Sequence, residues 1–113
     1  MPPTLSRDEI PPGTLDMLVL NTLSRGSELH GFEIAERIES GSVNVLRVEE
    51  GSLYPALQRM LVKGWIADSW GRTAGNRRAR YYRLTAAGRR QLERELAGYR
   101  RVSRAIALIL RPA

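Results

Sequence analysis

The chain of 113 residues is short enough for a single domain, and its 42% hydrophobic and 27% charged residues are typical of a folded globular protein. It contains no Cys and one His, which excludes disulfides, thiolate chemistry and the common zinc ligand sets within one chain. No apolar run reaches the ~18 residues of a membrane span, and residues 1–13 lack the basic-then-apolar layout of a signal peptide. Because Cys is absent, we expect the protein to be in the reducing cytoplasm.

The net charge of +6 is distributed unevenly along the chain. Residues 1–50 hold four Arg against nine acidic residues, whereas residues 51–113 hold fourteen Lys and Arg against three acidic residues. Such asymmetry indicates a basic surface that meets a polyanion. A solvated, Arg-rich surface would give the same composition, so the positions of the basic residues in the fold have to decide between the two.

The N-terminal half is predicted to be helical after a short arm. Residues 1–12 contain two Pro pairs and are predicted to form a flexible N-terminal arm. Helical spacing of apolar residues then predicts one helix over about 15–23 and a second over 31–40. Residues 43–48 are expected to be a short extended connection.

The stretch EEGSLYPALQRML at 49–61 predicts a third helix with an ambiguous start, because it contains Gly51 and Pro55. With Ser52 as the N-cap, Pro55 would lie in the first turn, where its missing N–H costs nothing. With a start at Glu50, Pro55 would bend the helix. One face is apolar and is predicted to face the core: Leu53, Leu57, Met60 and Leu61.

The opposite face of this third helix is polar and carries a hydroxyl, a phenol, an amide and two cations. Gln and Arg can make bidentate hydrogen bonds to base edges, and hydroxyl groups suit phosphates. The alternative interpretation is that Gly-Ser-Leu-Tyr-Pro only turns the chain and caps a core helix. If the face binds DNA, the contact residues are Ser52, Tyr54, Pro55, Gln58, Arg59 and Lys63.

Residues 65–70 and 79–84 are predicted to be the strands of a hairpin, joined by a Gly-rich and Arg-rich turn at 71–78. Five Arg and no acidic residue lie between Trp70 and Leu84. An acid-free Arg cluster at a hairpin tip favours contact with phosphates or a minor groove over a merely solvated face. The candidate DNA contacts in this hairpin are Arg72, Arg77, Arg78 and Arg80.

Three compact helices followed by a hairpin form the winged variant of helix-turn-helix, whose third helix enters the major groove while the hairpin lies along the adjacent backbone. We therefore predict a mainly α fold with a small β-hairpin. A winged helix-turn-helix DNA-binding domain is expected over 13–85 and a C-terminal dimerisation helix within 86–113. Trp65 and Trp70 are expected to pack in the core at the strand pair, with an aromatic pocket as the alternative.

The last helix is predicted to run from Ala86 to about Leu110, capped by Thr85, and would be ~37 Å long at 1.5 Å per residue. A projecting helix cannot bury its own apolar line, so we expect self-association through a pair of such helices. A membrane-surface helix is the competing interpretation, disfavoured because only about six residues at its end are strongly apolar. The predicted dimerisation residues are Leu92, Leu96, Tyr99, Ser103, Ile106 and Leu110, with Val102 as an alternative to Ser103.

Five segments stand in a characteristic order: GTLDMLVL (13–20), HGFEIAERI (30–38), VEEGSLYPALQRM (48–60), KGWI (63–66) and RARYYRLTAAGR (78–89). Together they resemble the PadR family of bacterial transcriptional regulators over about residues 13–92. The family signature, Gly-Ser/Thr-Leu-Tyr-Pro-Ala-Leu, is present in the third of these segments. A single C-terminal helix is similar to the short subgroup of the family.

The resemblance implies a homodimeric winged helix-turn-helix repressor, whose third helix and wing bind a palindromic operator in double-stranded DNA. It also implies C-terminal helices that dimerise and a possible hydrophobic small-molecule effector. The matching DNA-facing positions are Ser52, Tyr54, Pro55, Gln58 and Arg59. His30-Gly31 matches a family feature at the start of the second helix, where capping and packing are its expected roles.

No nucleophile–base pair, metal cluster or phosphate-cradling loop is present in the sequence, so we predict no catalytic activity, no metal and no cofactor. Two other functions compete with DNA binding. One is a winged-helix adaptor that binds protein through its third helix and does not bind DNA. The other is an RNA-associated basic protein, which is disfavoured because Tyr81 is the only obvious residue for base stacking.

Overall fold

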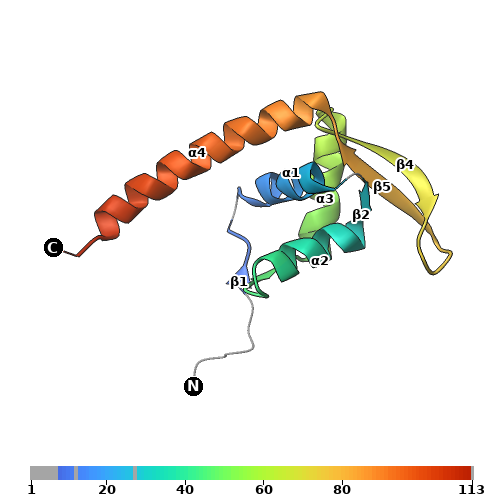
Figure 1. Ribbon diagram of the computed structural model, residues 1–113, viewed down its shortest axis with the longest axis horizontal. Coiled ribbons are helices and arrows are strands. Elements are labelled where there is room, and N and C mark those ends of the chain that lie inside the picture. Colours follow the sequence, from blue (N-terminus) through green and yellow to red (C-terminus); the bar gives the residue numbers. More distant parts are fainter. Residues whose placement is uncertain (1–7, 12, 27, 113) are drawn as a thin grey trace, which may run out of the picture.

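The computed structural model describes residues 8–11, 13–26 and 28–112. Helices α1, α2 and α3 pack together, the β4–β5 hairpin projects from one side of them, and α4 extends away on the other side (Figure 1). The predicted mainly α fold with a hairpin and a long last helix is confirmed. The helices are α1 (Leu15–Arg25), α2 (Gly31–Gly41), α3 (Glu50–Val62) and α4 (Ala86–Leu110). The strands are β1 (Asp8–Glu9), β2 (Leu29–His30), β3 (Leu46–Arg47), β4 (Ile66–Arg72) and β5 (Arg78–Leu84).

Strand β5 lies in the centre of a three-stranded antiparallel sheet, with β4 on one side and β2 on the other. Strands β4 and β5 pair from Ile66 opposite Leu84 out to Arg72 opposite Arg78. The hairpin is therefore longer than predicted, because both strands continue into the segment expected to be a turn.

The N-terminal arm was predicted to be flexible, but part of it forms a strand. Strand β1 pairs in parallel with β3, and the N–H of Asp8 donates to the Val45 carbonyl at 2.7 Å. Residues 1–7 and 12, which complete the predicted arm, lie outside the described residues. The prediction of a flexible arm is therefore wrong for Asp8 and Glu9, because these two residues pair through their backbones with β3, which precedes α3.

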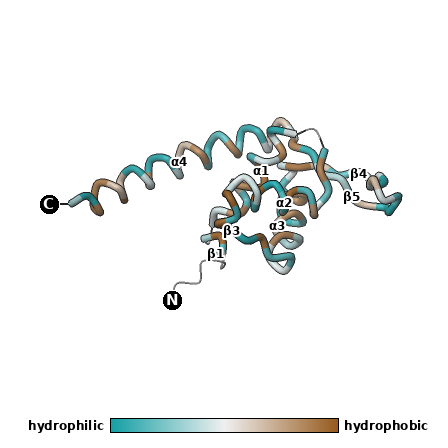
Figure 2. Tube along the Cα trace, turned by 60° about the horizontal axis from the view of Figure 1, so that its bottom comes forward, coloured by the Kyte–Doolittle hydropathy of each residue, from teal (hydrophilic) through white to brown (hydrophobic). Residues whose placement is uncertain are grey.

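The core lies between the three packed helices and the sheet. Its largest fully buried side chains include Leu20 and Leu23 of α1, Ile34 of α2, and Leu53 and Leu57 of α3. These helices carry apolar residues where they face one another, and apolar residues recur at the far end of α4, away from the body (Figure 2). The predicted core face of α3 is confirmed. Ala56, which was not predicted to face the core, is also fully buried, and the predicted Leu61 is only partly buried.

The side-chain caps predicted at His30 and Thr85 are present. The His30 Nδ1 accepts a hydrogen bond from the Glu33 N–H at 3.3 Å, while the Glu33 carboxylate accepts one from the His30 N–H at 3.1 Å. The Thr85 hydroxyl accepts from the Gly88 N–H at 3.0 Å and donates to the Gly64 carbonyl at 2.6 Å. The second cap fixes the start of α4 against the end of α3.

The first half of α4 belongs to the core of its own chain. Leu92 is only 5% exposed and Leu96 packs against the buried cluster. Helix α4 therefore begins as part of the winged-helix body and projects freely only beyond Leu96. The predicted boundary between residues 85 and 86 marks the start of the helix, but it does not separate two packed units.

Candidate nucleic-acid interface

Helix α3 begins at Glu50, with Glu49 at the N-cap position and no side-chain cap. Ser52 is therefore inside the helix and does not cap it, and Pro55 lies in the helix interior. Pro55 cannot donate to the carbonyl four residues back, which belongs to Gly51. Because Gly51 is exposed in the first turn, solvent can satisfy this carbonyl and the helix continues past the proline.

The outward face of α3 presents its polar side chains to solvent as predicted. Ser52, Pro55, Gln58 and Lys63 are exposed. Within the described part of the chain, the Gln58 amide makes no hydrogen bond, so it is free to pair with an external group. The Lys63 ammonium lies 4.8 Å from the centre of the Trp65 ring, which keeps it beside the end of the helix.

Tyr54 is 47% exposed, but its ring also packs against the start of α2. A Cβ added to Gly31 would lie 2.6 Å from the Tyr54 Oη and 2.9 Å from two ring carbons. Only glycine leaves room for the phenol at this position. Tyr54 therefore joins α3 to α2, and its hydroxyl lies over the N-terminus of α2.

Arg59 is engaged within the protein. Its Nη2 donates to the Asp16 carboxylate of α1 at 2.9 Å. A half-exposed ion pair of this kind contributes roughly 0–1 kcal/mol, so a phosphate could replace the carboxylate at little cost. Sequence reasoning missed this pair because the two residues are far apart in the chain and neither carries a local signal for the other.

The tip of the hairpin is closed by hydrogen bonds between Thr73 and Arg77. Asn76 adopts a positive φ of 64°, which fits a turn residue within the predicted turn at 71–78. Of the Arg residues expected in the turn, only Arg77 is there, because Arg72 and Arg78 face each other on the strands. The Arg72 guanidinium donates to the Asn76 carbonyl at 3.1 Å and so holds the tip.

Trp70 does not pack in the core, contrary to the prediction, and its side chain is 58% exposed. Strand alternation places Trp70 on the same face of β4 as the buried Ile66. Trp70 lies further along the hairpin, where the helices no longer cover this face. The guanidinium carbons of Arg78 and Arg80 lie 4.6 Å and 5.1 Å from the centre of its ring. Trp65, by contrast, packs against the core as predicted.

Arg80 also pairs with an acidic neighbour, since its Nε lies 3.1 Å from the Asp68 carboxylate. On the same face, burial raises the pKa of the Tyr82 phenol, and the neighbouring Arg80 guanidinium opposes this shift. The phenol therefore stays neutral near pH 7 and adds no negative charge. The exposed part of this face keeps an excess of positive charge.

The predicted dimerisation line on α4 is divided between two environments. Leu92 and Leu96 contact the core of their own chain, whereas Tyr99, Ile106 and Leu110 are exposed. Ser103 is half-buried within the line. The exposed residues recur at helical spacing along the part of α4 that projects from the body, and Val102 lies at their edge.

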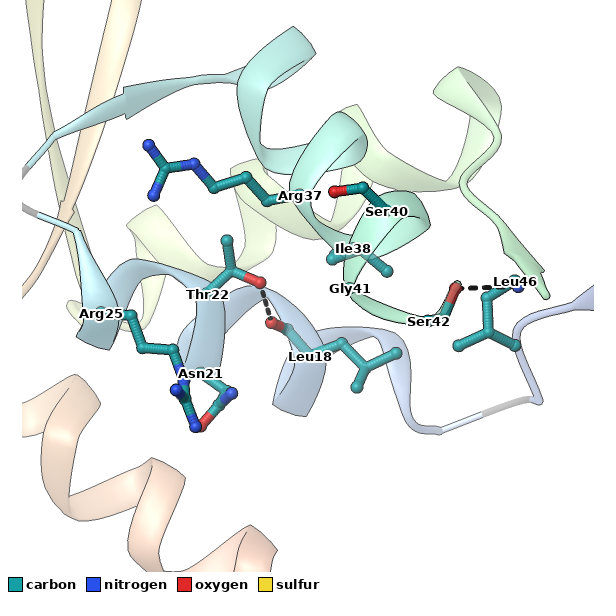
Figure 3. Close-up of a pocket in the computed structure, with 10 residues that line it drawn as sticks. All are labelled: Leu18, Asn21, Thr22, Arg25, Arg37, Ile38, Ser40, Gly41, Ser42 and Leu46. Atoms are coloured by element: carbon teal, nitrogen blue, oxygen red, sulfur yellow. Dashed lines mark hydrogen bonds between the residues drawn. The ribbon is translucent and has the colours of Figure 1, made fainter. Parts of the chain in front are cut away.

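A groove of about 610 Å³ lies between α1 and α2 (Figure 3). The guanidinium groups of Arg25 and Arg37 lie on either side of Thr22. Its apolar lining comes from Leu18, Ile38 and Leu46. Among residues 8–11, 13–26 and 28–112, there is no cluster of metal-ligating side chains, and no helix is long and apolar enough to cross a membrane.

Comparison with known proteins relates this arrangement to transcriptional regulators. The model of the transcriptional regulator PadR-like family matches residues 19–94. A PadR family transcription regulator from Clostridium difficile is 29% identical, with a TM-score of 0.75, over 88% of this chain and 100% of that one. A PadR-like regulator from Bacillus cereus is 27% identical, with a TM-score of 0.75, over 89% and 95%.

A third similar structure is that of Bacillus subtilis PadR in complex with operator DNA. It is 23% identical, with a TM-score of 0.65, over 76% of this chain and 48% of that one. At this identity the likeness concerns the fold alone. The winged-helix arrangement described above is therefore shared with a structure solved on DNA.

Proposed function

The chain belongs to the PadR-like family of transcriptional regulators, and we propose that it binds operator DNA sequence-specifically and represses transcription as a homodimer. The observation that carries the proposal is the combination of a free polar face on α3 with an Arg-rich hairpin beside it. Helix α3 contacts β4, so both belong to one rigid unit. A duplex that received α3 in its major groove would meet the hairpin along its backbone.

The two elements are proposed to have different tasks. On α3, the free Gln58 amide is the best candidate for reading a base edge, because a Gln side chain can pair bidentately with adenine. Ser52, Tyr54, Pro55 and Lys63 surround it and are proposed to contact the backbone or nearby bases. On the hairpin, Arg72, Arg77 and Arg78 are proposed to neutralise phosphates, while Arg59 and Arg80 would exchange their carboxylate partners for phosphates.

Dimerisation is proposed to occur through the projecting part of α4. The exposed apolar line from Tyr99 to Leu110 has no cover within the described chain, and pairing with the same line of a second copy would bury it. A twofold dimer places two α3 helices in symmetric positions, so we propose a palindromic operator. We further propose that the boundary between the DNA-binding and dimerisation parts lies between Leu96 and Tyr99.

The structure of Bacillus subtilis PadR with operator DNA supports DNA as the partner. We propose a cytoplasmic location, because binding to a bacterial promoter requires access to the chromosome. A hydrophobic small-molecule effector is also proposed, and the groove between α1 and α2 has the volume of a typical ligand site.

The decisive experiment is a fluorescence-anisotropy titration with DNA from the promoters of the chain's own gene and its neighbours. We expect tight binding to one fragment, weak binding to the others, and affinity that falls steeply with salt. Absence of salt-dependent binding to any duplex would refute the proposal and favour a protein-binding adaptor.

Replacing Arg77 and Arg78 together with Ala is expected to weaken binding to operator and unrelated DNA alike. Loss of two phosphate contacts should lower the magnitude of the log–log salt slope by about 1.8. The titration is repeated at several salt concentrations, with Arg83→Ala as the control, because Arg83 is exposed on the opposite face of β5. An unchanged slope in the double variant would contradict the role of the hairpin.

Gln58→Ala is expected to act on specificity instead. Loss of one bidentate base contact should weaken operator binding by about 1–3 kcal/mol and leave binding to unrelated DNA unchanged. Competition titrations with operator and scrambled duplexes measure this ratio. Equal weakening on both duplexes would show that Gln58 contacts the backbone.

A further inference from the structure

The exposed face of the hairpin carries an ordered stack of side chains. Cross-strand pairing places Trp70 opposite Arg80 and diagonal to Arg78 on one face of the β4–β5 ladder. At the base of the sheet the same face carries Ile66 and Tyr82, which are buried in the core. The stack therefore lies on strands that are anchored in the core at their base, and it is not part of the turn.

One indole ring holds two guanidinium groups in this stack. The guanidinium carbons of Arg78 and Arg80 lie 4.6 Å and 5.1 Å from the ring centre. A cation over an aromatic face is attracted by the negative potential of the ring. Two like charges would otherwise repel each other and sample separate rotamers, so the ring gathers them in one place.

The exposure of Trp70 is unusual for a residue that only stabilises the fold. The residue is 58% exposed, and the ring contacts described for it are those with the two cations. Burial therefore accounts for little of its position. A large aromatic side chain that keeps two guanidinium groups ordered lowers the conformational entropy they lose when they bind a polyanion.

The neighbouring carboxylate limits the freedom of Arg80 further. Asp68 accepts from the Arg80 Nε at 3.1 Å, so this guanidinium is held by the indole and by the carboxylate. Arg78 lacks such an acidic partner in the described chain and is positioned by the indole. The dependence on Trp70 should accordingly be larger for Arg78 than for Arg80.

We propose that Trp70 is a positioning residue for DNA binding, which holds Arg78 and Arg80 ready to contact phosphates of the DNA backbone. This inference rests on the proposed function, because it assigns the stack to the same duplex that α3 would read. Trp70 acts through the two Arg residues and needs no contact with a base. Its contribution should therefore be independent of DNA sequence.

The test is a comparison of two replacements that differ in aromatic character. Trp70→Leu keeps an apolar side chain but removes the ring, and is expected to weaken binding to all duplexes roughly tenfold. The log–log salt slope should fall by between about 0.9 and 1.8 as phosphate contacts become less occupied. Trp70→Phe keeps an aromatic ring, and its affinity for DNA is expected to stay within about threefold of that of the wild type.

A double-mutant cycle separates positioning from a direct contact or a loss of structure. In an Arg78→Ala, Arg80→Ala background, Trp70→Leu is expected to change DNA affinity by less than about twofold. Thermal unfolding by circular dichroism is measured for each variant. Equal binding by Trp70→Leu and wild type, an undiminished effect in the double-Ala background, or loss of affinity together with the fold would each overturn the inference. Failure of the wild-type protein to bind any duplex would instead refute the proposed function.

Discussion

Replacing Gly88 with Ala is expected to destabilise the protein by about 3 kcal/mol or more, because the new methyl group has no space. A Cβ at this position would lie 1.9 Å from the Trp65 carbonyl oxygen and 2.8 Å from the Leu84 Cδ1. The carbonyl cannot retreat freely, since it accepts a hydrogen bond from the Thr85 N–H at 3.1 Å. Relief of the clash requires α4 to move away from the junction of α3 and β4.

Thermal unfolding followed by circular dichroism at a fixed protein concentration measures this effect, and we expect the Tm to fall by more than about 10 °C. Gly98→Ala on the same helix is the matched control, because nothing lies within 4 Å of a Cβ added there. Alanine favours a helix by up to about 1 kcal/mol over glycine, so this variant should be as stable as the wild type or slightly more stable. Equal Tm values for the two variants would contradict the packing of α4 against the body.

Replacing Ile106 with Glu is expected to convert the proposed dimer into a monomer. Ile106 is 52% exposed in the single chain and lies in the middle of the apolar line from Tyr99 to Leu110. In a dimer paired through this line the new carboxylate would be buried without a partner, which costs several kcal/mol, typically more than about 3. The affinity for the operator should also fall, because a dimer that binds two half-sites at once binds far more tightly than a monomer that binds one.

Leu108→Glu is the control for this variant. Leu108 is 58% exposed on the same part of the helix, but it lies about 200° around the axis from Ile106. We expect Leu108→Glu to remain a dimer in sedimentation-velocity runs, while Ile106→Glu sediments as a monomer. A dimer in both cases, or a monomer in both, would refute pairing through the predicted line.

Most of the fold could be predicted from local sequence pattern. The apolar spacing in α1, α2 and α3, the turn residues around Asn76 and the cap at Thr85 each depend on groups only a few residues apart. Strands β1 and β2 escaped prediction, because two residues are too few to show a period. Strand β3 lies within the segment 43–48 that was expected to be extended, but its pairing with β1 was not predicted. Their pairing depends on backbone groups that only folding brings together.

The candidate site was predicted less completely than the fold. The exposed polar face of α3 followed from helical periodicity, and the Arg-rich hairpin followed from its composition. The partners of these cations did not, because the Arg59–Asp16 contact joins two distant helices. The stack on Trp70 depends on the strand register, which continues two residues beyond the predicted first strand. A correct register would have placed Trp70 opposite Arg80.

The charge asymmetry can be inferred from the residues alone, because it follows from composition. Helical faces and caps can be inferred too, because they reflect periodicity or hydrogen bonding within a few positions. Three features needed the folded chain: the start of α3 at Glu50, the exposure of Trp70 and the burial of Leu92. The exposure of Trp70 and the burial of Leu92 depend on what lies opposite each residue in space. Distance to a packed neighbour determines whether an apolar side chain joins the core or remains on the surface, and sequence spacing does not record that distance.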